Sequence, residues 1–215
     1  MQCIVLLGGS FDPVHSGHVT IAEHVCQLLG TRQLRLVPAG NPWQKTALIA
    51  TPEQRIAMLE IAFEASTLAV TIDLWEIANR GQTYSIDYLP AIREKTGKDV
   101  SLVFVVGADQ LLNFHTWRQW EVIFEYVHVL AVSRPGFDVS GSTMDRHVWH
   151  EFSKRLSMPQ EIRSIPSGMT YLDGTTHVNI SSTGVRDQIA HFAGHPPSVP
   201  PKVLDYIFRN NLYRP

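Results

Sequence analysis

Short apolar runs of strand length alternate along the chain with longer segments in which apolar residues recur at helical spacing. The short runs are rich in Val, Ile and Leu and lack polar alternation, which is typical of strands buried on both faces of a parallel sheet. We therefore predict five strands, at residues 3–7, 34–38, 69–72, 102–106 and 127–132.

Helices are predicted between these strands. In the clearest case, residues 18–29, the apolar positions follow the i, i+3, i+4 rule of an amphipathic helix. A second helix covers 52–65, with Thr51 as N-cap and Pro52 in the first helical position. Further helices are predicted at residues 84–95, 117–125, 144–156, 181–191 and 199–208.

Alternating strands and helices predict an α/β protein, a Rossmann-like doubly wound parallel sheet with flanking helices. The 215 residues fit a single domain, 1–215, because domain sizes run to about 250 residues. Within it, residues 136–168 are less regular and are interpreted as an insertion or cap, and residues 181–215 as C-terminal helices.

Charge and composition exclude several classes of partner. Eighteen Lys and Arg residues against twenty Asp and Glu leave a net charge of −2. The protein therefore lacks the overall positive field that would attract nucleic acids or acidic membranes. No run approaches the ~18 apolar residues of a membrane span, and the opening MQCIVLLGG is too short for a signal sequence. Cys3 and Cys26 lie in apolar segments and are interpreted as buried thiols. We expect a cytoplasmic protein. A homo-oligomer is possible, and the sequence does not decide between this and a monomer.

A glycine-containing loop follows the first predicted strand. Gly8 and Gly9 allow backbone N–H groups to approach an anion, and the next helix points its N-terminus at the same place. The loop lacks both the dinucleotide fingerprint and the Walker pattern. The loop therefore suits phosphate.

Two histidines stand at the end of this loop, three positions apart. If the helix begins near Ser16, the imidazoles of His15 and His18 can both donate to phosphate oxygens at its N-terminus. Two alternatives stay open: the rings satisfy turn carbonyls, or they bind a metal together with ligands from elsewhere.

The segment Ile180-Ser181-Ser182-Thr183-Gly184-Val185-Arg186 places three hydroxyls at a predicted helix start and an arginine in its first turn. The hydroxyls are ordinary N-caps. A cation at the positive end of a helix dipole is unfavourable unless an anion is bound or a neighbouring acid, here Asp187, offsets it. The motif therefore predicts a second phosphate site, for the outer phosphates of a triphosphate.

With these two motifs, His-Ser-Gly-His at 15–18 and Ile-Ser-Ser-Thr-x-x-Arg at 180–186, the sequence resembles the nucleotidyltransferase superfamily. More narrowly, it is similar to the family of bacterial nicotinate-mononucleotide adenylyltransferases, which make deamido-NAD from nicotinate mononucleotide and ATP. The resemblance runs from Ile4 to Tyr213 and includes Glu76-Ile77-x-x-Arg80-Gly81, Thr83-Tyr84-Ser85-Ile86-Asp87, Gly107-Ala108-Asp109-Gln110-Leu111, Trp117 and Arg134-Pro135-Gly136.

The resemblance implies site residues on two sides. The catalytic set is His15, His18, Lys45 and Arg186, and the phosphate-binding set is Gly8, Gly9, Ser10, Phe11, Ser182, Thr183 and Arg186. The mononucleotide side has Trp117 stacked on the pyridine ring, the backbone amides of Ser85 and Arg118 near its carboxylate, Asp109 at a ribose, and Gly107 and Arg134. The family's Pro-Pro-His-Lys loop is replaced by Asn41-Pro42-Trp43-Gln44-Lys45, which removes a loop histidine.

The residues also have simpler interpretations. Trp117 can pack in the core with Trp120 and Phe124, and Asp109 can be a helix N-cap. Lys45 and Arg134 can be solvated surface cations.

Zinc is not expected at His147, His150 and Glu151, because their order is not His-Glu-x-x-His. The predicted set therefore holds no metal site.

The sequence offers cations and dipoles but no obvious covalent nucleophile. We expect direct in-line attack of the acceptor's phosphate oxygen on the α-phosphorus of ATP, with Mg²⁺ on the departing phosphates. Open alternatives are a histidine that carries AMP covalently, a nucleotide-binding regulator without turnover, and an enzyme that uses nicotinamide mononucleotide instead.

Overall fold

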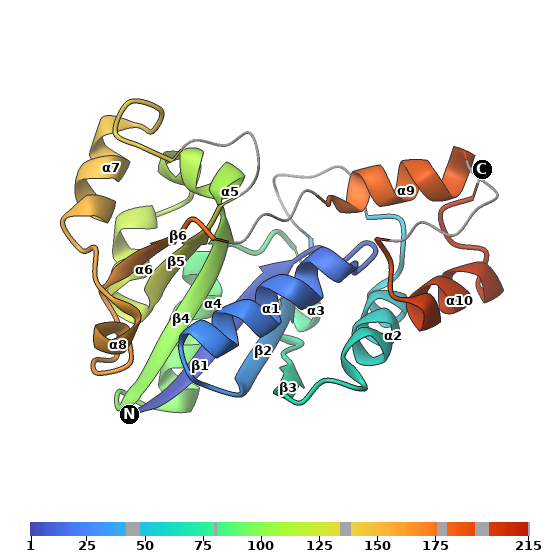
Figure 1. Ribbon diagram of the computed structural model, residues 1–215, viewed down its shortest axis with the longest axis horizontal. Coiled ribbons are helices and arrows are strands. Elements are labelled where there is room, and N and C mark those ends of the chain that lie inside the picture. The colour runs from blue at the N-terminus through green and yellow to red at the C-terminus, as the bar shows by residue number, and fades with distance from the viewer. Residues whose placement is uncertain (42–47, 80, 134–138, 176–179, 192–197, 215) are drawn as a thin grey trace.

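Six parallel strands run through the centre of the protein in the order β3-β2-β1-β4-β5-β6 (Figure 1). Figure 1 is a computed structural model, and the structure describes residues 1–41, 48–79, 81–133, 139–175, 180–191 and 198–214. The chain starts in the middle, moves to one edge and returns past β1 to the other, which is the doubly wound order. The predicted fold class is confirmed.

The strands are β1 (Gln2–Gly9), β2 (Gln33–Pro38), β3 (Ala69–Ile72), β4 (Val100–Gly107), β5 (His128–Val132) and β6 (Thr170–Asp173). The first five lie where the apolar runs predict them. The sixth, β6, was not predicted, because its four residues begin with Thr170 and end with Asp173 and form no apolar run. It pairs in parallel with β5, with Val129 opposite Thr170.

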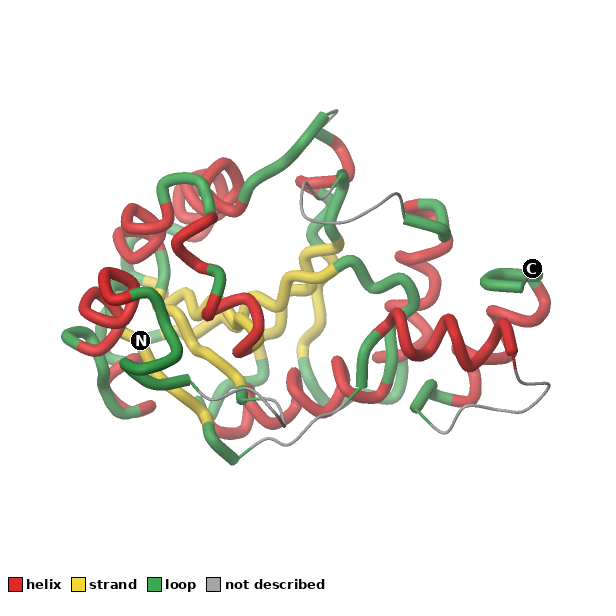
Figure 2. Tube along the Cα trace, turned by 90° about the horizontal axis from the view of Figure 1, so that it is seen from above, coloured by secondary structure: helices red, strands yellow, loops and turns green. Residues whose placement is uncertain are grey.

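Two helical layers cover the sheet (Figure 2). The helices are α1 (Ser16–Leu28), α2 (Pro52–Phe63), α3 (Trp75–Ala78), α4 (Ser85–Thr96), α5 (Ala108–Leu112), α6 (Ile123–Tyr126), α7 (Arg146–Ser153), α8 (Pro159–Ile162), α9 (Ser182–His191) and α10 (Pro201–Arg209), with 3₁₀ turns η1 (Phe114–Thr116) and η2 (Trp120–Val122). Odd positions of β1, such as Val5, face α1, α2, α9 and α10, whereas even positions, such as Leu6, face α4, α6 and α7. Each face of the sheet therefore has its own core.

The predicted helix at 117–125 is wrong as a single element. The structure has η2 and α6 there, because Gln119 takes a left-handed conformation with φ 49°. Trp117 itself is extended, and its ring packs near Phe114 at a centroid distance of 5.0 Å. The chain is thus turned so that Trp117 lies beside the end of β4 rather than on a helix face.

Two further regions complete the fold. Between β5 and β6, α7 and α8 follow one another, and Val148 and Phe152 are buried against the α4 side of the sheet. Near the C-terminus, α10 packs against α2, far from it in sequence (Figure 1). Among the described residues, no helix is both long and apolar enough to cross a membrane.

His128 is fully buried at the start of β5. Its Nε2 lies 2.9 Å from the carbonyl oxygen of Ile165, and its Nδ1 accepts from the N–H of Met169 at 3.0 Å. Burial lowers the pKa of His128 to about 4. The folded protein therefore keeps this ring neutral, with the proton on Nε2.

We predict that acid destabilises the fold through His128. Between pH 6.5 and 4 the unfolded chain binds a proton at this ring and the folded chain does not, so the free energy of unfolding falls as pH falls, by up to about 3 kcal/mol. Urea unfolding at pH 7.5 and pH 4.5 measures the difference. His128→Gln, which cannot titrate, should show a smaller pH dependence; an equal dependence in the two proteins would contradict the assignment.

Candidate functional site

A cavity of about 650 Å³ opens at the carboxyl edge of the sheet, where β1 and β4 lie side by side. This is the point at which the strand order reverses, where doubly wound proteins bind their ligands. Most predicted site residues line it: Gly8, Gly9, Ser10, His15, His18, Ser85, Gly107, Asp109, Trp117, Ser182, Thr183 and Arg186. The loop after β1, the end of β4 and the start of α9 therefore share one cavity.

The loop after β1 is shaped by a buried ring. Phe11 is fully buried and has φ 48°, a conformation uncommon for a residue with a side chain. A Cβ at Gly9 would lie 3.1 Å from the ring of Phe11, a tight contact that would push the ring aside, so glycine allows this close approach. Phe11 does not line the cavity itself; its packing determines where the backbone of the loop lies.

His15 and His18 stand at the start of α1 and stack on each other, with ring centroids 3.8 Å apart and an interplanar angle of 27°. The N–H of His15 donates to Nδ1 of His18 at 3.2 Å. Because Nδ1 accepts, the proton of a neutral His18 lies on Nε2, from which it can be donated to an oxygen in the cavity. The phosphate-binding role of the pair stays a prediction.

Asp12 is the most connected side chain of the loop, and it was not among the predicted residues. It is 2% exposed, and its carboxylate accepts from the N–H of Ile49 at 2.8 Å, the N–H of Ala50 at 3.0 Å and the hydroxyl of Tyr213 at 2.7 Å. An acid inside a predicted anion-binding loop was the signal that could have found it. The carboxylate therefore holds the backbone of residues 49 and 50 next to the loop.

The second motif folds onto the same loop. Arg186 donates through Nη1 to the carbonyl oxygen of Asp12 at 2.7 Å, and Ser182 donates to the carbonyl oxygen of Pro13 at 3.0 Å. Ser181 alone acts as a helix cap, since its Oγ accepts from the N–H of Gly184 at 3.1 Å. The hydroxyls therefore do more than cap α9, and Arg186 faces the loop and the cavity.

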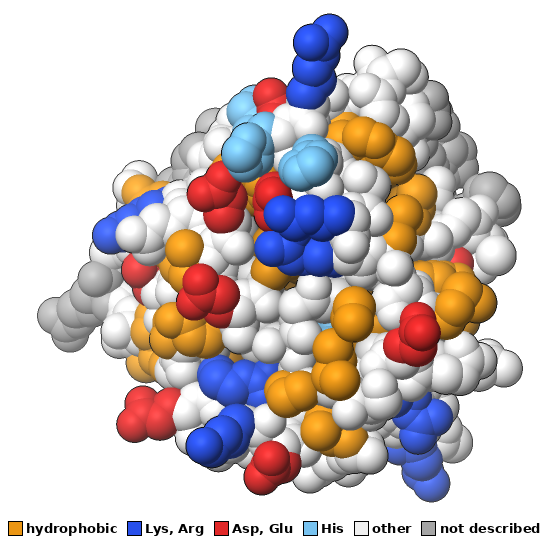
Figure 3. Space-filling view, turned by 90° about the vertical axis from the view of Figure 1, so that its left-hand side faces the viewer, with side chains coloured by type: hydrophobic (Ala, Val, Ile, Leu, Met, Phe, Trp, Pro, Cys, Tyr) orange, Lys and Arg blue, Asp and Glu red, His pale blue; other side chains and the backbone are white. Residues whose placement is uncertain are grey.

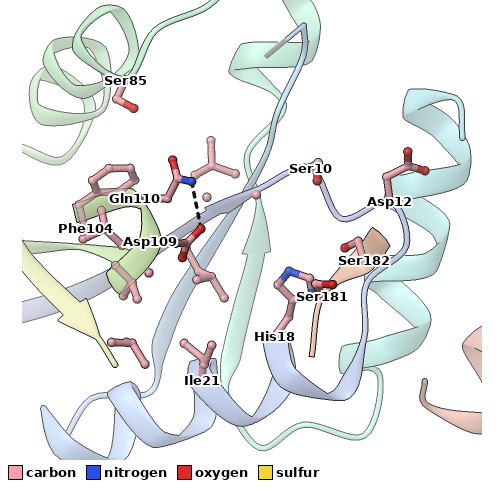
Figure 4. Close-up of a pocket in the computed structure, with 18 of the residues that line it drawn as sticks. Ser10, Asp12, His18, Ile21, Ser85, Phe104, Asp109, Gln110, Ser181 and Ser182 are labelled. Atoms are coloured by element: carbon pink, nitrogen blue, oxygen red, sulfur yellow. Dashed lines mark hydrogen bonds between the residues drawn. The ribbon is translucent and has the colours of Figure 1, made fainter. Parts of the chain in front are cut away.

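The other end of the cavity is formed by the end of β4 and the start of α4. In Figure 4, Ser85, Phe104 and Gln110 lie toward this end, and His18, Ser181 and Ser182 lie toward the other. Asp109 lies in the first turn of α5, whose N-cap is Gly107, so the N-cap interpretation of Asp109 is wrong. Its Oδ2 accepts from Gln110 at 3.1 Å.

Trp117 lines the cavity and is also packed by aromatic neighbours. Its ring centroid is 6.2 Å from that of Phe104 and 5.0 Å from that of Phe114. Trp120, in contrast, packs with Phe114 and Phe124 and does not line the cavity. One face of Trp117 is therefore supported by the core while the residue borders the cavity.

Glu76 lines the cavity, although the sequence predicts no role for it beyond its place in the motif at residues 76–81. Its Oε2 accepts from the hydroxyl of Thr83 at 2.9 Å and from the N–H of Gly40 at 3.4 Å. Burial raises the pKa of Glu76, opposed by these hydrogen bonds and by the charge of Arg55. Glu76 thus ties the segment after β2 to the segment before α4.

Other lining residues were also missed by the sequence analysis. They carry no distinctive motif and, apart from Leu48 in the connection before α2, come from strands and helix faces that periodicity assigns to the core: Ile21, Val37, Tyr88, Phe104, Val105, Val106 and Val132. No local signal separates such a residue from a core residue.

Among the predicted residues that the structure describes, Phe11 and Arg118 do not line the cavity. The guanidinium of Arg118 is exposed, 3.7 Å from Asp87 and over the ring of Tyr84. The role of its backbone amide stays a prediction. Lys45 and Arg134 lie outside the described residues, as does the start of the 136–168 stretch.

No metal centre is formed by the chain itself within the described residues. They contain no group of three or more His, Cys, Asp or Glu side chains able to hold a metal. The face beside α7 carries histidines next to charged groups (Figure 3). There His147 lies 2.6 Å from Glu121 and packs edge-on to Trp120. The zinc interpretation of this face therefore gains no support.

One cavity at the reversal point of a doubly wound sheet, lined by His18 and Arg186 at one end and by Trp117 at the other, is the place where proteins of this fold bind their ligands. The family model described as cytidylyltransferase-like matches residues 6–188. The chain belongs to this family and, within it, to the nicotinate-nucleotide adenylyltransferases, to which it is similar over nearly its whole length. The resemblance drawn from the sequence is confirmed.

Three relatives illustrate the similarity. A probable nicotinate-nucleotide adenylyltransferase of Herminiimonas arsenicoxydans is 44% identical, over 99% of this chain and 97% of that protein. The nicotinate-nucleotide adenylyltransferase of Salmonella typhimurium is 32% identical, over 97% of both chains. The Plasmodium falciparum nicotinic acid mononucleotide adenylyltransferase complexed with NaAD shares the fold, with a TM-score of 0.75 at 18% identity over 99% of this chain and 98% of that one.

We predict that neutral His18 is the Nε2–H tautomer, because its Nδ1 accepts from the N–H of His15. A long-range ¹H–¹⁵N correlation spectrum of the imidazoles, recorded at pH 8, distinguishes the two tautomers. Exposed His115 provides a reference ring. A protonated Nδ1 on His18 would contradict the geometry of the site.

Proposed function

We propose that the protein transfers AMP from ATP to nicotinate mononucleotide, which gives deamido-NAD and pyrophosphate in NAD biosynthesis. The observation that carries the proposal is the single cavity lined by His18 and Arg186 at one end and by Trp117 at the other. Relatives named for this activity match nearly the whole chain at 32% and 44% identity.

The cavity suggests where each substrate lies. The triphosphate lies at the phosphate end, against Gly8, Gly9, Ser10, His15, His18, Ser182, Thr183 and Arg186. The mononucleotide lies at the other end, with its pyridine ring on Trp117, a ribose at Asp109, and Ser85 and Gly107 near the ring. Lys45 on the ATP side and Arg134 and the Arg118 amide on the mononucleotide side complete the proposed set.

The reaction requires positioning and charge stabilisation rather than a covalent partner. A phosphate oxygen of the mononucleotide forms a bond to the α-phosphorus of ATP, and the bond from that phosphorus to the bridging oxygen breaks, so pyrophosphate leaves with the bonding electrons. His18 donates from Nε2 to the phosphate oxygens as their charge shifts, and Arg186, held by the carbonyl of Asp12, faces the same charge.

A magnesium ion fits this site as part of the ATP complex. Mg²⁺ is usually held by substrate phosphates, waters and one or two carboxylates. Asp12, the acid of the phosphate loop, already accepts three hydrogen bonds. The triphosphate would therefore hold the ion, which neutralises charge on the leaving pyrophosphate.

We also propose a cytoplasmic protein with no nucleic-acid or membrane partner. The two cysteines, Cys3 and Cys26, are free and buried, as is common in a reducing compartment. The net charge of −2 gives no general attraction to polyanions.

His18→Ala should lower kcat by about 10²–10³, because one donor to the transition state is lost. A pyrophosphate-release assay with ATP and nicotinate mononucleotide measures it. His150→Ala, which changes an exposed residue of α7, is the matched control and should keep wild-type turnover. Wild-type turnover in the His18 variant would remove the assigned role, and absence of pyrophosphate release in the wild type would favour a regulator.

The acceptor is tested by comparing kcat/KM for nicotinate and nicotinamide mononucleotide. We expect the acid to be preferred by at least about tenfold, since discrimination follows from differential binding of the transition state. Preference for the amide would contradict the proposed substrate.

Ternary-complex kinetics are expected, and ping-pong kinetics with an isolable adenylyl-protein would support a covalent histidine instead.

A further inference from the structure

Tyr213, two residues from the C-terminal end, reaches the phosphate loop from the far end of the chain. Its hydroxyl donates to Oδ1 of Asp12 at 2.7 Å, across 201 positions of sequence. Tyr213 is 6% exposed, and burial and the neighbouring Asp12 raise its pKa well above the usual value. The phenol therefore stays protonated and remains a donor to this carboxylate.

The backbone after α10 is turned so that the ring reaches this place. Asn211 and Tyr213 both have positive φ, 50° and 60°, and the N–H of Leu212 donates to the carbonyl of Ile207 at 3.0 Å. Leu212 is 8% exposed and belongs to the core cluster that also contains Ile207 and α2 residues. The end of the chain is thus anchored by apolar packing, and the hydroxyl of Tyr213 is left to hydrogen-bond.

Asp12 passes this contact on to the ATP side of the cavity. Its carboxylate holds the N–H groups of Ile49 and Ala50, which follow the segment that carries Lys45. Its carbonyl oxygen accepts from Arg186. Removing one donor leaves part of a buried carboxylate unsatisfied, and the carboxylate then shifts toward solvent or toward its other donors. Arg186 and residues 49–50, which we place beside the triphosphate, therefore both depend on the position of Asp12.

Arg55 supports the same loop from α2. Its guanidinium is fully buried and donates to the carbonyl oxygen of Ser10 at 2.8 Å, and its charge interacts favourably with Asp12. Arg55 supplies the opposite charge, whereas Tyr213 supplies a directed hydrogen bond. Tyr213 therefore fixes the orientation of the Asp12 carboxylate, whereas Arg55 balances its charge.

We propose that Tyr213 is a positioning residue for adenylyl transfer: through Asp12 it fixes the phosphate loop relative to Arg186 and to residues 49–50. The inference rests on the proposed function. It concerns only the ATP side, because no contact of Tyr213 or Asp12 reaches Ser85 or Trp117 among the described residues.

Tyr213→Phe removes the hydroxyl and keeps the ring. We expect kcat/KM for ATP to fall about ten- to hundredfold, the scale of a lost hydrogen bond to a charged group. KM for nicotinate mononucleotide should change less than about twofold. Tyr206→Phe, the same change in half-buried Tyr206 of α10, is the matched control and should leave both constants unchanged.

Steady-state kinetics with each substrate varied in turn, at a temperature where circular dichroism shows all variants folded, separate the outcomes. Wild-type constants in the Tyr213 variant, or an equal loss on both substrates, would overturn the proposal. So would a Tyr213 variant that does not fold, because the phenol would then act in folding. In the double variant with Asp12→Asn, the loss should be no larger than for Asp12→Asn alone, and additive losses would contradict action through Asp12. A wild type without turnover would instead refute the proposed function.

Discussion

The site depends on holding an irregular stretch of backbone, residues 10–16, in one conformation. Its carbonyl oxygens accept from remote donors: Arg55 on Ser10, Arg186 on Asp12 and Ser182 on Pro13. Carbonyl oxygens that faced a ligand would repel phosphate, and a loop cannot satisfy them by regular hydrogen bonding. Covering them with guanidinium and hydroxyl donors makes the loop suitable for an anion.

The topology explains why the donors converge. In a doubly wound parallel sheet the carboxyl ends of the strands and the N-termini of the following helices meet at one edge. Helices α1, α2, α9 and α10 all lie on the same face of the sheet, so their residues reach the loop after β1 from one side. The connection before α10 adds the carbonyl of Ser198, which accepts from the N–H of Ser16 at 2.8 Å. Helix α9 therefore lines the cavity, and the connection before α10 helps to hold the loop after β1.

Five strands and most longer helices could be predicted because short apolar runs and amphipathic spacing are visible in the sequence alone. The edge strand β6 and the broken segment around Gln119 could not, since the former depends on pairing with β5 and the latter on a single left-handed residue. The same division holds at the site. His18 and Arg186 lie in recognisable motifs, whereas Tyr213 matters through a contact with Asp12 that no spacing displays.

The charge of the site is local, and the sequence total of −2 conceals it. The N-termini of α1 and α9 open at the cavity, and each carries roughly half a positive charge. Arg186 adds a cation at the cavity, and Arg55 adds one beneath it, opposite Asp12. Because Arg55 balances Asp12, the acid can hold the loop without repelling a triphosphate. Asp12 is thus a structural part of the loop, and the charge of the buried Arg55 is what makes this acid compatible with the proposed binding of an anion.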